Sequence, residues 1–371
     1  RGLGDVYKRQ CAQGADSIMF FRKVLTGLAA GLLLCVQAGF AGVYAAVPND
    51  APKDIKHIIG FYYGNGENIL IRENGGNLEL LYRFAQKDKD FSGAIIYPLA
   101  KEHFDAYLLN EVGPMSGSEA NVRFERDSDG YGISCRVGGH IYSRYFLGRT
   151  TGERAKEFRF PEHSAEEWAA MRAETNKAAV PEVLSAGQQA ELVDAATVGG
   201  LHIDSRYGVA DNCFGAPLYN SEKLFVGSEA AQALTKVQQH LAVYGYGLVL
   251  WDAYRPWSVS KLANLALPLD KKHLLEDPET KGSAHNTGNA VDVSLYDLAT
   301  GEPIEMISDF DEPSMRQFAG YAGGTSRQRY LRSLLKESME LYGFKGIEME
   351  WWHFDYQPSI NCCLLYTSDA A

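Results

Sequence analysis

Short apolar and aromatic runs separated by turn signals fill residues 55–160 and predict β-structure. The turns are marked by Asn74-Gly75-Gly76 and Asp129-Gly130, residues that favour tight chain reversals. Strands this short and this evenly spaced are typical of small antiparallel barrels and sandwiches. We therefore predict an all-β barrel or sandwich domain here. The runs are FYYG, NILIRE, LELLYRF, GAIIYPL, FDAYLL, NVRFERD, GYGISCRV and IYSRYFL.

Residues 161–185 are charged and rich in alanine, which indicates a linker or a packing helix. Ser164 is followed three residues later by Glu167, a spacing typical of a capping box at the start of a helix.

Residues 186–360 alternate between helical and strand patterns. Residues 228–245 predict an amphipathic helix capped by Ser228, and residues 326–343 predict a second helix ended by Gly343. The segments LVLWDAY, NAVDVSLY and IEMEWWHFDY predict strands. This order of elements predicts a small α+β domain with a central antiparallel sheet.

Both ends of the chain differ in character from the middle. Residues 1–18 and 361–371 have the composition of non-native flanking sequence and are set aside. Residues 19–45 begin with Met19, carry a short basic stretch and continue into an apolar stretch, which predicts a secretory signal peptide. An uncleaved anchor helix is the alternative. We expect a secreted or periplasmic protein with no stable membrane span after cleavage.

Composition narrows the function classes. The 371 residues are 46% hydrophobic and 22% charged, with a net charge of −11, which excludes a disordered chain and a multi-span membrane protein. The sequence shows no long basic stripe, so we do not expect a nucleic-acid partner. Residues 46–360, between the predicted signal peptide and the predicted C-terminal flank, contain two cysteines, Cys135 and Cys213. Export permits a disulfide between them, but two separate buried thiols are the more common outcome.

Chemically active residue types gather in two segments. In residues 283–292, His285 and Asp292 flank a glycine turn that leads into a predicted strand. In residues 350–353, a second histidine, His353, follows Glu350. Two imidazoles and one carboxylate suit catalytic zinc, which keeps a further position open for water. Glu350 is then available as the general base.

Glu350 and His353 share one site only under a geometric condition. Positions i and i+3 of a flat strand face opposite sides, so the strand must bend, bulge or end there. Glu348 is the alternative base and has the same facing problem.

Three motifs now identify a resemblance over roughly residues 190–358. They are SAHNTGNAVD at 283–292, EWWHF at 350–354 and DAYRP at 252–256, with a looser match in IDSRYGVADNCFGAPLY. The chain resembles the zinc D-alanyl-D-alanine dipeptidases of the VanX type. The β domain lies outside this match and more weakly resembles the lipocalin-like domain of some secreted serine hydrolases.

The resemblance implies a role for each matching residue. One zinc ion per chain would be bound by His285, Asp292 and His353, and Glu350 would be the general base. Arg255 would polarise the scissile carbonyl and stabilise the oxyanion. Ser283 and Asp311 would hold the ammonium group of a small D,D-dipeptide. Cys213 departs from the family, which usually has phenylalanine at this position.

Three functions stay open from the sequence. The first is a zinc D,D-dipeptidase, and the second is a zinc D,D-carboxypeptidase or peptidoglycan peptidase acting on longer stem peptides. The third is a non-enzymatic zinc- or wall-binding module. Glu350 and Arg255 argue against it, because a structural zinc site needs neither residue. We expect the β domain to be a spacer or packing partner rather than a wall-binding module. The physiological role and the oligomeric state are left open.

Overall fold

The computed structural model describes residues 46–82, 93–103, 105–109, 121–144, 159–184 and 190–357. The predicted signal peptide at 19–45 and the predicted non-native flanks at 1–18 and 361–371 lie outside these residues. Within the described ranges, no helix combines the length and the apolar character needed to span a bilayer.

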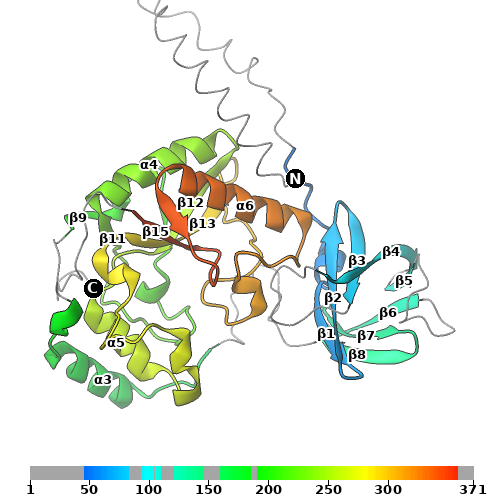
Figure 1. Cartoon of the computed structure of the whole chain (residues 1–371), viewed down its shortest axis with the longest axis horizontal. Helices are drawn as coiled ribbons and strands as arrows, with labels where there is room; N and C mark the ends of the chain where they lie inside the picture. Colours follow the sequence, from blue (N-terminus) through cyan, green and yellow to red (C-terminus); the bar gives the residue numbers. More distant parts are fainter. Residues whose placement is uncertain are drawn as a thin grey trace, which may run out of the picture. The chain divides into compact units, whose positions relative to one another are not determined.

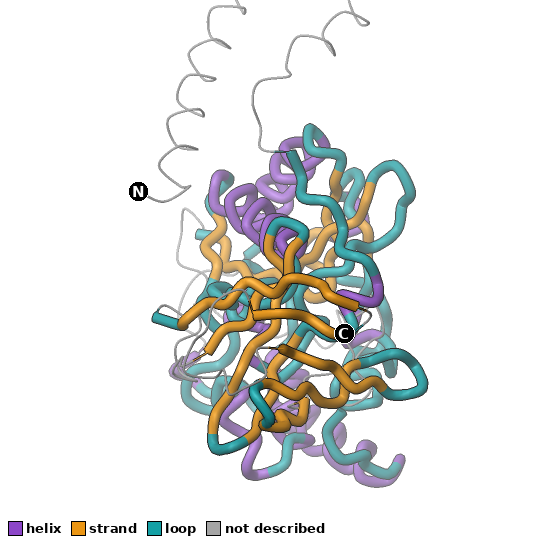
Figure 2. Tube along the Cα trace, turned by 90° about the vertical axis from the view of Figure 1, so that its right-hand side faces the viewer, coloured by secondary structure: helices purple, strands orange, loops and turns teal. Residues whose placement is uncertain are grey.

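The predicted β domain is a closed barrel of eight antiparallel strands, and every predicted run contributes one strand (Figure 1). Pairing of the first strand with the last closes the barrel. A short helix, α2 (Lys53–Lys56), precedes it. The strands are β1 (Gly60–Gly64), β2 (Glu67–Asn74), β3 (Asn77–Tyr82), β4 (Ile95–His103), β5 (Ala106–Leu109), β6 (Asn121–Arg126), β7 (Gly132–Val137) and β8 (His140–Arg144). Figure 2 shows the strands in orange.

Side chains fill the interior of the barrel. Tyr62, Leu80, Tyr142 and other large apolar residues are buried there in one cluster, as expected because eight strands enclose a space that side chains can fill. Cys135 belongs to this cluster, and Cys213 lies in the second domain. Both thiols are free, so the disulfide that export would permit is not formed.

The second domain is built on a five-stranded sheet, which confirms the predicted α+β class. The order is β10 (His202–Ile203), β12 (Tyr246–Asp252), β13 (Ala290–Asp297), β15 (His353–Tyr356) and β14 (Phe344–Gly346). All neighbours are antiparallel except β10 and β12. A separate pair joins β9 (Leu192–Asp194) to β11 (Phe225–Gly227).

Helices cover the sheet. Helix α4 (Ser228–Ala242) contacts β12, and α6 (Ser326–Leu341) contacts both α4 and β14 (Figure 1). Helix α3 (Ala165–Lys177) contacts α5 (Trp257–Ala266). Apolar residues from these helices and from β12 and β13 form one buried cluster, and both faces of these two central strands are buried except at the half-buried end of β13.

Two predicted helix starts have different outcomes. The capping box of α3 is present, with Ser164 accepting from the Glu167 amide and the Glu167 carboxylate accepting from the Ser164 amide. The predicted Ser228 cap is wrong, because Ser228 is the first residue of α4 and Gly227 occupies the cap position without a side-chain bond. The amide of Ser228 instead donates to the Glu191 carbonyl.

The barrel packs on the second domain within one compact unit of the chain. Phe61, Leu70 and Leu81 belong to the apolar cluster of the second domain rather than to the barrel interior. The rings of Phe61 and Tyr321 lie 6.1 Å apart. The barrel is therefore a packing partner of the second domain.

We predict that Gly64→Ala destabilises the barrel. A Cβ at this position of β1 would overlap the carbonyl oxygen of Ile141 on β8 and lie 3.0 Å from Tyr142 Cα. Overpacking of this kind costs about 1–3 kcal/mol, so the midpoint of thermal unfolding should fall. Gly199→Ala is the control, since nothing lies within 4 Å of its added Cβ. Equal midpoints for the two variants would contradict the prediction.

Candidate active site

Three neighbouring strands place three polar residues in one row across the sheet. Asp292 on β13 is paired with Asp252 on β12 and with His353 on β15. Residues directly opposite each other on neighbouring antiparallel strands have side chains in contact range. All three are at least nine-tenths buried, so the row puts two carboxylates and an imidazole together inside the protein.

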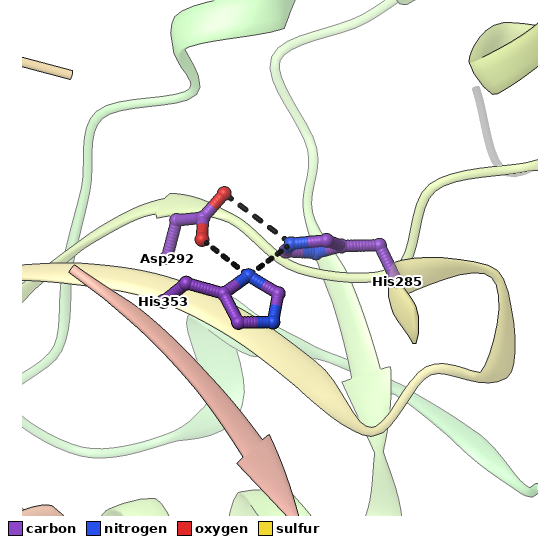
Figure 3. Close-up of side chains that lie close together, drawn as sticks. All are labelled: His285, Asp292 and His353. Atoms are coloured by element: carbon purple, nitrogen blue, oxygen red, sulfur yellow. Dashed lines mark hydrogen bonds and ion pairs between the residues drawn. The ribbon is translucent and has the colours of Figure 1, made fainter. Parts of the chain in front are cut away.

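His285 joins this row from a neighbouring turn, and the three predicted metal ligands converge (Figure 3). His285 Nε2 lies 3.3 Å from Asp292 Oδ2, and His353 Nδ1 lies 3.1 Å from Asp292 Oδ1. The two imidazole nitrogens are 3.1 Å apart. The three donor atoms all lie within 4.8 Å of one another. Two imidazole nitrogens and one carboxylate form a donor set that fits zinc.

The remaining ring nitrogen of each histidine has its own partner. His285 Nδ1 lies 2.7 Å from the carbonyl oxygen of Ala253, and His353 Nε2 lies 3.1 Å from Asp355 Oδ1. Partners of this kind fix the tautomer and orientation of metal-binding imidazoles. They leave His285 Nε2 and His353 Nδ1 facing the shared centre.

The turn that carries His285 is locked by local bonds. It forms a short 3₁₀ helix over Ala284–Thr287, which Ser283 caps and which Gly288 ends with a φ of 77°. Asn286 donates to the carbonyl of Arg255 at 2.7 Å and to Ser260 Oγ at 2.9 Å. The Arg255 amide donates to the His285 carbonyl at 3.1 Å. The motif therefore contributes more than the histidine itself, because its other residues hold the turn that positions His285.

Opposite charges set the pKa values of the two central ligands. Burial alone would raise the pKa of Asp292, but the imidazoles of His285 and His353 hold it well below its usual value. Burial alone would lower the pKa of His353, but the hydrogen bonds with Asp292 and Asp355 raise it to about 10.

Arg255 is held rigidly beside the ligand cluster. Its guanidinium bonds to Asp252 Oδ2 from Nε at 2.9 Å and from one terminal nitrogen at 2.6 Å. That nitrogen lies 4.0 Å from Asp292 Oδ2, and the guanidinium carbon lies 4.8 Å from the centre of the Tyr207 ring. Tyr219 donates a short hydrogen bond to the other oxygen of Asp252. A buried cation thus lies at the edge of the site.

Glu350 lies beside the cluster because the last strand begins later than the sequence predicts. The strand predicted over 347–356 covers only His353–Tyr356, so the facing rule for a strand does not apply to Glu350. Its Oε2 lies 3.9 Å from His353 Nδ1. Burial, together with the charge of Asp292, raises the pKa of Glu350 to about 7.

Glu348, the alternative base, is exposed. Its backbone carbonyl accepts from the Ala319 amide at 3.0 Å, and its charge acts on Arg332. Of the two glutamates, Glu350 is therefore the one placed beside the metal-ligand cluster.

Asp311 faces the same site from the segment between β13 and α6. Its Oδ2 accepts from the Tyr207 hydroxyl at 2.6 Å, and the Cys213 thiol lies 3.6 Å from the same oxygen. Burial raises the pKa of Asp311 to about 6, and the charge of Asp292 acts in the same direction. Asp311 also adopts a left-handed φ of 54°, a strained conformation that in folded proteins is concentrated at functional sites.

Ser283 has a local structural role in addition to its predicted one. Its hydroxyl oxygen accepts from the His285 amide at 3.3 Å, and its own amide donates to Asn286 Oδ1 at 2.8 Å. The contact with a substrate ammonium stays a prediction.

Sequence reasoning missed three supporting residues, namely Tyr207, Tyr219 and Asp355. Asp355 lies two residues after His353 on the same strand, so alternation along the strand predicts that the two share a face. Tyr207 and Tyr219 both fall in the looser motif at 203–219, but nothing local assigns them to particular carboxylates.

Comparison with known proteins agrees with this geometry. The D-Ala-D-Ala dipeptidase family, Peptidase_M15, matches residues 188–361. The D-alanyl-D-alanine dipeptidase of Enterococcus faecalis is 32% identical over 176 residues, which cover 42% of this chain and 85% of the relative. That of Escherichia coli is 34% identical over 176 residues, covering 47% of this chain and 89% of the relative.

A solved structure, the LdcB LD-carboxypeptidase, is more distant. It is 21% identical, covers 36% of this chain and 59% of its own, and has a TM-score of 0.24. The two dipeptidases, in contrast, match over most of their own length. From these relatives and the converging ligand set, we conclude that the chain belongs to the D-Ala-D-Ala dipeptidase family of peptidases and is a metallopeptidase.

Proposed function

We propose that this enzyme is a zinc-dependent D,D-dipeptidase that hydrolyses D-Ala-D-Ala in the cell envelope. The observation that carries the proposal is the place of Asp311. Tyr207 and Cys213 both bond to one oxygen of its carboxylate, Oδ2, and the charges of Asp292 and Arg255 both act on its pKa. A fixed carboxylate near the site suits the ammonium group that a dipeptide carries next to its scissile bond. The names of the relatives support the same substrate.

The metal would be held by His285, Asp292 and His353, one ion per chain. A bound Zn²⁺ supplies a Lewis acid that polarises a carbonyl and brings the pKa of a water to about 7. The protein's contribution is the ligand geometry and the outer partners Ala253 and Asp355, which aim the imidazoles.

Glu350 would move the proton. Its carboxylate is close to the cluster and has a pKa of about 7, near the value that suits both accepting and returning a proton at neutral pH. It would take the proton of the attacking water and then give it to the nitrogen of the leaving D-alanine. Cleavage of the amide bond would thereby release two D-alanine molecules, with the leaving nitrogen departing as an amine rather than as an anion.

Arg255 would stabilise the oxyanion that forms as water adds to the carbonyl. Its bonds to Asp252 fix the guanidinium before substrate arrives. A preorganised donor of this kind contributes about 10²–10³ in rate. Ser283 and Asp311 would bind the substrate ammonium. The cell-envelope location rests on the signal peptide predicted at 19–45.

The metal ligands are tested by metal content. Purified enzyme should contain about one zinc ion per chain, and His285→Ala should lose both zinc and activity because one of three ligands is gone. His140→Ala is the matched control, since His140 is exposed on the barrel. Elemental analysis that finds full zinc occupancy in His285→Ala would reject the assignment.

The base is tested by two isosteric variants. Glu350→Gln should keep its zinc and lose most of kcat, by about 10²-fold or more, because an amide cannot accept the proton of water. Glu348→Gln should retain near-normal kcat, since Glu348 is exposed and bonded elsewhere. If Glu348→Gln is the inactive variant, the choice of base is wrong.

Substrate length separates the dipeptidase from the carboxypeptidase. We expect kcat/KM for D-Ala-D-Ala to exceed that for N-acetyl-D-Ala-D-Ala by more than about 10²-fold, because a half-buried carboxylate that loses its ammonium partner to an apolar acetyl group is costly. Asp311→Asn should collapse this ratio by lowering turnover of the dipeptide alone. Turnover of a stem pentapeptide comparable with that of the dipeptide would instead favour a D,D-carboxypeptidase.

A further inference from the structure

The segment between β13 and α6 carries Asp311 and touches the barrel near both of its ends. We call residues 304–325 the Asp311 loop. Barrel-side residues contact it at Glu305 and again at Tyr321, Ala322 and Gly324, and Asp311 lies between these positions in the sequence. The family match begins at residue 188, so these contacts join the matched domain to a domain outside the match.

The first contact is an ion pair. Lys56, at the end of the short helix α2, lies 2.8 Å from Glu305 and 2.7 Å from Asp50. The Lys56 side chain is only 11% exposed and that of Glu305 27%, so solvent screens this pair less than a surface pair. Lys56, Ile59 and Gly60 from the barrel side line a small cavity together with Glu305 and Ile307 of the loop.

The second contact is built around Glu73 at the end of β2. Its amide donates to the Gly324 carbonyl at 3.1 Å, and its carboxylate accepts from the Ser326 amide at 2.6 Å. Arg329 donates to the Glu73 carbonyl at 2.9 Å. Glu73 is 4% exposed. Its carboxylate therefore bonds, away from solvent, to the first amide of α6, and amides in the first turn of a helix have no partner within the helix. Nearby, Arg72 donates to the Ala322 carbonyl at 3.2 Å.

The middle of the loop also supports the segment that contains Glu350. The Trp351 amide donates to the Gln317 carbonyl at 2.8 Å, and the Trp351 indole donates to Ser308 Oγ at 2.7 Å. A shift of the loop therefore moves Asp311 directly and Glu350 through its neighbour Trp351.

We propose that the barrel positions the substrate-binding and proton-transfer groups, with Lys56 and Glu73 as positioning residues that hold the two ends of the Asp311 loop. The part of this proposal that concerns substrate selectivity rests on the dipeptidase function proposed for Asp311. Small displacements matter at such a site, because a misplacement of about 1 Å costs about 10²-fold in rate.

The test compares the full chain with Lys56→Met and with Glu73→Gln. Methionine keeps most of the apolar stem of Lys56 and removes the ion pair. Gly64→Ala is the matched control, because it perturbs the barrel at β8 rather than at the loop contacts. All measurements are made well below the unfolding midpoint of each variant, so a loss of folded protein does not contribute.

Two readouts decide the outcome. Hydrogen exchange of amides in residues 306–319 and 348–352 should be faster in Lys56→Met and Glu73→Gln than in Gly64→Ala. The ratio of kcat/KM for D-Ala-D-Ala over N-acetyl-D-Ala-D-Ala should fall about tenfold in Lys56→Met. In the double variant with Asp311→Asn, Lys56→Met should add little to this fall, because both act through one carboxylate.

The two proposals fail differently. If exchange in both segments is unchanged in Lys56→Met and Glu73→Gln, the barrel does not position the loop, whichever substrate the enzyme takes. Faster exchange with unchanged kcat and KM for every peptide also overturns the positioning role. If Asp311→Asn alone leaves the selectivity ratio unchanged, Asp311 does not bind the substrate ammonium. The hydrogen-exchange rates and kcat of Lys56→Met and Glu73→Gln then still decide whether the barrel positions the loop.

Discussion

Two carboxylates, Asp252 and Asp292, lie opposite each other on neighbouring strands in the interior of the sheet. Charges withdrawn from water cost several kcal/mol unless they are paired, so this row requires cations around it. Arg255 pairs with Asp252 and the two histidines contact Asp292. Much of the local architecture follows from this requirement, including the bond from the Arg255 amide to the His285 carbonyl, which ties the arginine motif to the histidine motif.

The balance of charge around the row also explains what the site attracts. Asp252 pairs with Arg255, whose guanidinium also lies 4.0 Å from Asp292, and Asp292 contacts the two imidazoles. The charges of Asp292 and Asp311 raise the pKa of Glu350, and the charge of Asp292 raises that of Asp311, so these carboxylates lie near one another. Under the proposed function, a divalent cation on the ligand cluster and an ammonium beside Asp311 would offset the negative charge of these carboxylates. One electrostatic environment would then suit both the metal and the N-terminus of a small peptide.

The sequence predicts the ligands better than it predicts their surroundings, for a physical reason. His285, Asp292 and His353 are recognisable because a metal fixes residue types and spacing, whereas the donors to Asp311 come from distant segments that only the fold brings together. The last strand begins only at His353, and the residues before it bond to Gln317 and Ala319 instead, a pairing that alternation along 347–356 does not encode. Residue type alone predicts Ser228 as the helix cap. The sequence does not show that the Ser228 amide bonds to the distant Glu191 carbonyl and that the helix begins at Ser228 itself.

The docking of the barrel did leave a signal in the sequence. A strand with one buried face alternates, but the runs at 69–71 and 80–82 are continuously apolar, as expected for strands covered on both faces. Ile69, Ile71 and Leu80 fill the barrel, while Leu70 and Leu81 point outward into the cluster of the second domain. The relatives match over 85–89% of their own length and only 42–47% of this chain, so the match leaves them little length for such a barrel. The apolar outer face of the barrel therefore packs on the second domain of this chain, and the same face is flanked by the polar contacts of Arg72 and Glu73 with residues 322–326.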